Sequence, residues 1–152
     1  MLANPLAGHN QALPVNGDFQ IRSCGQSLSL SSISLALQSP TTVEQDVGSI
    51  TIQLGAQDAS GVDHAELGWL NPAGNAWSHV FCQFNGSETC TLTELIDSGV
   101  ARWSLAGDYT NAQIIVYDVN GIYRVYYGNG STFSPNQSSG SHGFSIPDLI
   151  IE

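Results

Sequence analysis

Basic side chains are almost missing from this sequence. The 152-residue chain has no lysine, and its few arginines stand against 13 carboxylates, which gives a formal net charge of −10. Such an excess of negative charge repels phosphate backbones and anionic lipid surfaces. We therefore expect no nucleic-acid partner. The same field favours cations and tolerates neutral polymers such as uncharged polysaccharide.

Charged residues of both signs make up only 11% of the chain, so serine, threonine, asparagine, glutamine and glycine must cover much of the surface. Long hydrophobic runs are missing as well. No stretch approaches the roughly 20 apolar residues of a transmembrane helix, and we expect no membrane insertion. No segment keeps a helical apolar period over three turns. Apolar residues still form 41% of the sequence, enough for the core of one domain.

Cysteine is scarce but suggestively placed, at Cys24, Cys82 and Cys90. The last two flank a segment that contains Asn85-Gly86, a strong signal for a tight turn. We expect Cys82 and Cys90 to face each other across a hairpin and to form a disulfide, with two buried thiols as the alternative. Cys24 is then a free thiol or the partner of a residue elsewhere. The composition is that of a secreted protein.

What the sequence does contain is short segments in which apolar and polar residues alternate. This period of two predicts strands at residues 27–37, 49–56, 62–70, 76–84, 89–96, 113–119 and 122–127. The phase slips at Ser31-Ser32, which predicts a β-bulge. Residues 113–119 are the most apolar and are predicted to form a central strand. Asn120-Gly121 predicts a type I′ turn after it.

The strand pattern also suggests an organisation along the chain. Residues 1–26 are rich in proline and glycine and are predicted to be a linker or N-terminal extension. Residues 27–128 form the predicted β-sandwich core. Residues 129–152 begin as a polar loop over 129–141 and end in a possible edge strand over 144–151, broken at Pro147. About seven to nine short strands, with a turn roughly every ten residues, predict an all-β antiparallel sandwich.

Several short motifs resemble those of a known class of domain. They are Asp58-Ala59-Ser60-Gly61-Val62, Asn71-Pro72-Ala73-Gly74, Trp103-Ser104-Leu105 and Ile115-Val116-Tyr117-Asp118-Val119-Asn120-Gly121. The core from about residue 33 to 127 resembles the immunoglobulin-like β-sandwich modules appended to secreted bacterial proteins. The chain departs from that pattern at Asn71, where a serine is usual, and at Ile122, where an asparagine is usual. The resemblance implies an accessory role beside an enzyme or adhesin.

Hard oxygen donors lie on two turns that this fold would bring to one end of the sandwich. They are Asp58, Ser60, Asp63, Asp118 and Asn120. Calcium requires six to eight oxygens at one point, so these residues are a candidate calcium site. The alternative is that the aspartates and the asparagine are turn formers that bind their own backbone.

Aromatic residues supply the second candidate site, because tyrosine and tryptophan offer a flat apolar face with a polar handle to a sugar ring. Trp69 and Trp103 are predicted to be core residues. Trp77 lies beside a turn and is the candidate for exposure. On the strand at 122–127, Arg124 and Tyr126 share one face, and Tyr123, Val125 and Tyr127 share the other. We assign Trp77, Arg124 and Tyr126 as candidate ligand-binding residues.

Catalytic signatures are not evident. No Gly-x-Ser-x-Gly motif occurs, and the four histidines do not lie at zinc-ligand spacing. Asp63 and His64 are neighbours on a strand and should point to opposite faces, so Asp63 should not orient His64. Asp63 and Glu66 also have opposite parity, which argues against a pair of glycosidase carboxylates. We expect no catalytic residues and no enzyme.

The sequence therefore favours a non-catalytic binding or spacer module of a secreted or cell-surface protein. Its expected partners are neutral polysaccharide and the other domains of a larger secreted chain, with calcium as a possible stabilising ion. The alternative is an adhesin or surface-protein repeat that binds protein or self-associates through its edge strands.

Overall fold

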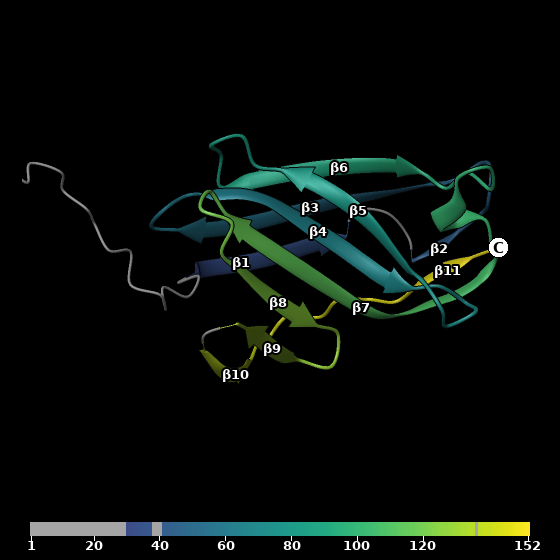
Figure 1. The fold of residues 1–152 in the computed structure, drawn as a ribbon. Helices are drawn as coiled ribbons and strands as arrows, with labels where there is room; N and C mark the ends of the chain where they lie inside the picture. Colours follow the sequence, from purple (N-terminus) through teal and green to yellow (C-terminus); the bar gives the residue numbers. More distant parts are fainter. Residues whose placement is uncertain (1–29, 38–40, 136) are drawn as a thin grey trace, which may run out of the picture.

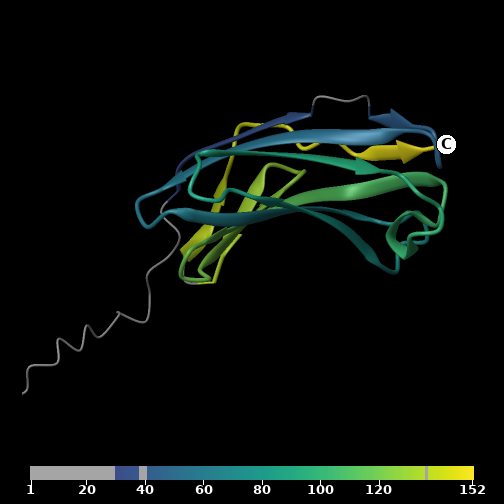
Figure 2. The same ribbon diagram turned by 90° about the horizontal axis from the view of Figure 1, so that it is seen from above.

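The computed structural model describes residues 30–37, 41–135 and 137–152. These residues form two facing β-sheets (Figures 1 and 2). The predicted extension at residues 1–26 and Cys24 lie outside the described residues. The strands are β1 (Leu30–Leu37), β2 (Thr42–Val43), β3 (Ser49–Asp58), β4 (Val62–Leu70), β5 (Trp77–Gln83), β6 (Thr89–Leu95), β7 (Gly107–Asp118), β8 (Tyr123–Tyr127), β9 (Ser131–Ser134), β10 (Gln137–Ser141) and β11 (Leu149–Ile151).

The smaller sheet has the order β1-β3-β6, and the larger has the order β10-β9-β8-β7-β11-β2. Strand β4 pairs with the side of β7 that faces away from β8 and β11, and β5 pairs with β4. Every pairing is antiparallel except that of β2 with β11. The prediction of a mostly antiparallel all-β protein is confirmed. The described residues form more strands than predicted, because β2, β9 and β10 carry too little apolar alternation to be found in the sequence.

The core lies between the sheets and follows the predicted alternation. On β3, Ile50, Ile52, Leu54 and Ala56 are buried, because every second side chain of a strand points to the same side. Buried Ala65, Leu67 and Trp69 belong to β4 of the other sheet. Trp69 and Trp103 are both core residues, as predicted, and their rings lie 6.2 Å apart. The one helical element among the described residues is a short 3₁₀ turn, Ala101–Trp103.

Strand β7 is central, as its apolar sequence predicted. It pairs with β4 along one side and with β8 and β11 along the other. Its register with β4 shifts between Leu70/Thr110 and Gly68/Gln113, where Asn111 adopts a left-handed φ of 55°. This is the geometry of a β-bulge, and it re-aims the side chains on both sides of it. The bulge predicted in β1 is also present, between Leu30 and Ser32.

The C-terminal part differs from its prediction. Residues predicted as a polar loop form the hairpin β9–β10, which adds to the edge of β8. The predicted edge strand is reduced to β11, which lies between β7 and β2 rather than at an edge. Leu149 and Ile151 of β11 are buried. The β9–β10 hairpin is organised by backbone pairing, and β11 has only three residues, too few for an alternating pattern to show. The sequence signal for both elements was therefore weak.

The turns predicted at the two Asn-Gly pairs have different outcomes. Asn85 and Gly86 have φ of 51° and 79°, the two positive values that a type I′ turn requires. In the second turn only Gly121 has a positive φ, 77°, so the type I′ prediction is wrong there. The reason is the Asp118 side chain, which accepts hydrogen bonds from the backbone N–H groups of Asn120 and Ile122 and sets a different turn.

The predicted disulfide between Cys82 and Cys90 is present. Its setting differs from a simple hairpin, because β5 belongs to the larger sheet and β6 to the smaller one. The bond therefore links the two sheets, and both cysteines are buried. A disulfide favours an oxidising, extracytoplasmic location.

Removing this link should destabilise the protein measurably. We expect the double variant Cys82→Ser/Cys90→Ser to lose about 2.5 kcal/mol of unfolding free energy, since the bond closes a short loop in the unfolded chain. Urea unfolding followed by tryptophan fluorescence measures this difference. The natural chain under reducing conditions is the control and should match the variant. Equal stability of oxidised and reduced protein would show that the disulfide does not constrain unfolding.

Candidate functional site

The outward face of the larger sheet carries an unusual number of aromatic side chains. They come from β5, β7, β8 and β9 and comprise Trp77, Phe81, Tyr117, Tyr123, Tyr127 and Phe133. Trp77 and Phe81 are 44% and 53% exposed. Exposed rings gathered on one face of a sheet are a common setting for ligand contact, because burying them against a partner removes apolar area from water.

A pocket of about 370 Å³ opens at one end of this face. Four separate segments of the chain meet there. They contribute Trp77 from β5, Asn111 and Ala112 from the bulge of β7, Tyr127, Gly128 and Asn129 from the end of β8, and Ile146 and Asp148 from the segment before β11.

Three hydrogen bonds hold these segments together. The N–H of Gly128 donates to the Ala112 carbonyl at 2.7 Å, which ties the end of β8 to the bulge. The indole N–H of Trp69 donates to the Pro147 carbonyl at 3.0 Å, which fixes the segment that carries Asp148. The N–H of Ala112 lies 3.5 Å from Asp148 Oδ1. The pocket is therefore built on strands and anchored loops, which suits a preformed binding site.

The lining combines two rings with a few polar groups. Asn129 Oδ1 accepts from the N–H and hydroxyl of Ser131, at 3.0 and 2.6 Å, which leaves its NH₂ group to donate elsewhere. Asp148 supplies the one carboxylate among the described lining residues. Such a lining can hold a flat polar molecule by ring contact and hydrogen bonds.

Trp77, the candidate for exposure, is exposed and lines this pocket. Tyr126, the second aromatic residue assigned to ligand binding, is buried, with 3% of its surface exposed. Its ring packs against Phe144 at 5.6 Å and against His142 at 5.7 Å, and burial raises the pKa of its hydroxyl. The segment before β11 covers this side of β8.

Arg124 is partly buried on the same side of β8 as Tyr126 and hydrogen-bonds to it. It does not line the pocket. The opposite side of β8, which carries Tyr127, is the one that lines it. Sequence reasoning recognised that the residues of this strand divide between two faces. It could not tell which face a distant segment covers.

The two aspartate turns of the calcium hypothesis do meet. The Ser60 hydroxyl lies within hydrogen-bonding distance of Asp58 Oδ1 and of Asp118 Oδ2, the latter at 3.0 Å. The N–H of Val119 donates to the Gly61 carbonyl at 3.1 Å and ties one turn to the other.

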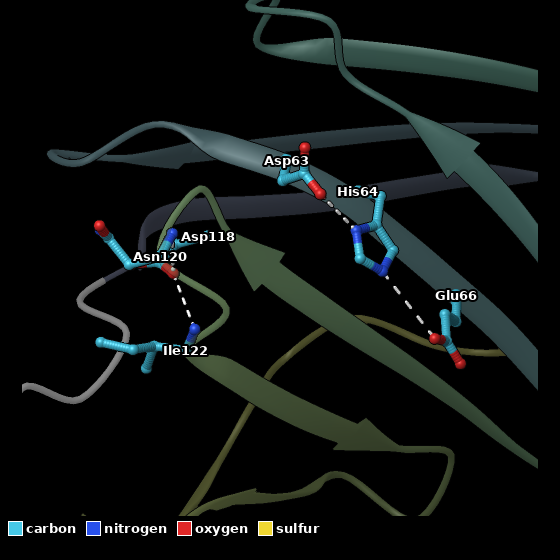
Figure 3. Close-up of polar contacts among 6 residues, drawn as sticks. All are labelled: Asp63, His64, Glu66, Asp118, Asn120 and Ile122. Atoms are coloured by element: carbon cyan, nitrogen blue, oxygen red, sulfur yellow. Dashed lines mark hydrogen bonds and ion pairs between the residues drawn. The ribbon is translucent and has the colours of Figure 1, made fainter.

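The Asp118 carboxylate is already well supplied with donors. Its Oδ1 accepts from the N–H groups of Asn120 and Ile122, both at 2.8 Å (Figure 3 draws the bond from Ile122). Its Oδ2 accepts from Asn120 Nδ2 at 3.2 Å. Burial opposes ionisation, but these hydrogen bonds outweigh it, and the pKa of Asp118 is lowered. This is the turn-forming arrangement, the alternative to a metal site.

The remaining residue of the calcium hypothesis, Asp63, makes its side-chain contact with His64. Its Oδ2 lies 2.7 Å from Nδ1 of His64, so the prediction that Asp63 does not orient His64 is wrong (Figure 3). A shift in the β4–β7 register between Val62 and His64 breaks the simple alternation there. Val62 and Ala65 are both buried, with two outward residues between them, which places Asp63 and His64 on the same side.

The pair continues as a chain of alternating acids and imidazoles. His64 Nε2 lies 3.9 Å from Glu66 Oε1, and His79 Nδ1 lies 3.4 Å from Glu66 Oε2. The His64 ring stacks on Tyr117 at 4.4 Å. The imidazole of His79 lies over Gly68, where an added Cβ would approach it to 2.0 Å, and its ring is 5.9 Å from Trp77. This row of acids and imidazoles thus supports the outward face of the larger sheet beside the pocket.

Comparison with known proteins gives no identity for this fold. No protein-family model matches the chain, and neither curated proteins nor solved structures gave a match. Among the described residues, no group of three or more histidine, cysteine, aspartate or glutamate side chains is arranged to hold a metal ion. In the same part of the chain, no helix is long and apolar enough to cross a membrane.

The lowered pKa of Asp118 makes a pH-dependent prediction. A depressed folded pKa contributes stability above the ordinary aspartate pKa, and that stability is lost as the pH falls through the folded value. We expect Asp118→Asn to cost about 1–2 kcal/mol at pH 7, since hydrogen bonds to a charged acceptor are the stronger ones. The variant should also lose less stability than the natural chain as the pH falls below the ordinary aspartate pKa.

Thermal and urea unfolding across this pH range measures both effects. Asp108→Asn, at an exposed strand position, is the matched control and should change the stability by less than about 0.5 kcal/mol. If the stability of Asp118→Asn falls with decreasing pH in parallel with that of the natural chain, Asp118 is ruled out as the titrating group.

Proposed function

We propose that this chain is a non-catalytic binding module of a secreted or cell-surface protein and that its pocket holds a unit of a polysaccharide. In this proposal the fold is a variant of the immunoglobulin-like accessory sandwich, and its partners include the other domains of a larger secreted chain. The observation that carries it is the pocket between Trp77 and Tyr127.

The lining suits a sugar ring. A pyranose has apolar C–H faces and a rim of hydroxyls, and it needs flat rings on its faces and hydrogen-bonding groups around its edge. Trp77 and Tyr127 provide the rings, and Asn111, Asn129 and Asp148 provide amide and carboxylate groups. A volume of about 370 Å³ is near the lower end for ligand pockets and suits one sugar unit.

The net charge of the protein narrows the class of polysaccharide that it can bind. With a net charge of −10, the protein repels sulfated or uronic-acid chains. A neutral polysaccharide meets no such barrier. The disulfide between Cys82 and Cys90 supports a location outside the cytoplasm, where such polymers occur.

A truncation series on β5 and β8 tests the pocket. We expect Trp77→Ala and Tyr127→Ala each to weaken saccharide binding about tenfold or more, because each removes a ring contact and its buried area. Phe81→Ala is the matched control: Phe81 is an exposed ring on the same strand as Trp77 but outside the pocket. A glycan array followed by calorimetry on the best ligand supplies the measurement.

The contrary results are distinct. Equal losses from Phe81→Ala and Trp77→Ala would place binding elsewhere on the face. No binding to any glycan, together with a dimer in sedimentation velocity, would favour the adhesin-type alternative. That alternative has its own support, since β5 and β6 each pair on one side only within the described part of the chain, and expose Phe81 and Leu95.

The proposal includes calcium as a stabilising ion at the joined turns of Asp58 and Asp118, supported by their convergence on Ser60. We expect saturating calcium, at about 100 times its Kd, to add about 2.7 kcal/mol of stability, and chelator to remove it. Asp58→Asn should abolish the response, and Asp108→Asn should keep it. A melting temperature that is indifferent to calcium and chelator removes the ion from the proposal.

A further inference from the structure

The pocket contains an unbalanced carboxylate. Asp148 is exposed to solvent, and among the described residues its one hydrogen bond is the long contact with the Ala112 N–H, 3.5 Å from Oδ1. The described residues that line the pocket carry no basic side chain. Most of the hydrogen-bonding capacity of this carboxylate is therefore available to a ligand, since an ionised carboxylate accepts about four hydrogen bonds.

The groups around Asp148 favour a cation as well as a hydroxyl. Trp77 and Tyr127 line the same pocket, and the faces of such rings attract an ammonium group. The net charge of −10 adds a long-range electrostatic field that also attracts cations. Two rings and a carboxylate around one small cavity form a site in which a protonated amine makes contacts that a neutral hydroxyl does not.

We propose that the pocket selects an amino sugar, a hexose unit with a free, protonated amine, over the neutral hexose and over its N-acetylated form. The ammonium group donates to the Asp148 carboxylate and lies against the Trp77 and Tyr127 rings, and the sugar ring fills the rest of the pocket. Acetylation removes the charge and adds bulk, so it weakens both contacts. This inference rests on the proposed function, because it names the saccharide that the same pocket prefers.

The experiment compares three tetrasaccharides with the same linkage, composed of glucosamine, N-acetylglucosamine or glucose, by calorimetry at pH 6 and low salt. We expect the glucosamine oligomer to bind about tenfold more tightly than the other two. The preference should shrink when salt is added and when the pH rises above the pKa of the amine.

Matched variants separate a specific site from general attraction between a polycation and an acidic protein. Asp148→Asn should abolish the preference for glucosamine while keeping binding of the neutral oligomers. Asp108→Asn changes the net charge equally at an exposed position outside the pocket and should keep the preference. Trp77→Ala should weaken all three ligands.

The remaining outcomes each decide against the inference. Equal affinity for the three oligomers, or a preference that survives Asp148→Asn, overturns amine selection but leaves saccharide binding in place. Glucosamine binding that is insensitive to Trp77→Ala shows non-specific charge attraction and overturns it as well. Failure of all three oligomers and of the wider glycan array removes the proposed function itself.

Discussion

The pairing of β7 with three other strands is the constraint on which the rest of the structure depends. Its twelve residues span the larger sheet, with β4 on one side and β8 and β11 on the other. Its inward side chains, such as Ile114 and Val116, belong to the core. The register of β7 is regular with β8 and β11 but shifts with β4. The shift with β4 coincides with the bulge at Asn111, and the pocket opens there.

Polar side chains organise the ends of the sandwich in the way that apolar ones organise its centre. Asp118 shapes its own turn through two backbone N–H groups and meets the neighbouring turn through Ser60. Burial of the carboxylate opposes its ionisation, but the hydrogen bonds that it accepts outweigh this effect and lower its pKa. A calcium ion would bind the same kind of group, because its ligands are oxygens such as those of carboxylates. The oxygens of Asp118 that would bind a calcium ion in the proposed site are the ones that already accept hydrogen bonds within the turn.

The candidate site was partly visible in the sequence. Trp77 stood out because a tryptophan next to a turn has little chance of burial on both sides. Tyr127 and Asp148 did not stand out, because their importance comes from meeting Trp77 and Asn111 across segments distant in the chain. The burial of Tyr126 on β8 was also not visible in the sequence, because it depends on the packing of Phe144, a residue distant in the chain, against the ring. The contact of Asp63 with His64 was missed because a register shift broke the alternation on which the prediction relied.

The sequence by itself determined the strand class, the buried sets of β3 and β4, the central place of β7 and the pairing of Cys82 with Cys90. Each of these depends on residues close together in the chain, where alternation and turn chemistry act directly. Only the tertiary structure decided that the disulfide joins two sheets, that β11 lies between β7 and β2, and that the pocket opens beside Tyr127. These features arise from register and from the covering of one segment by another. Such choices depend on the summed packing of the whole chain, which no short stretch of sequence contains.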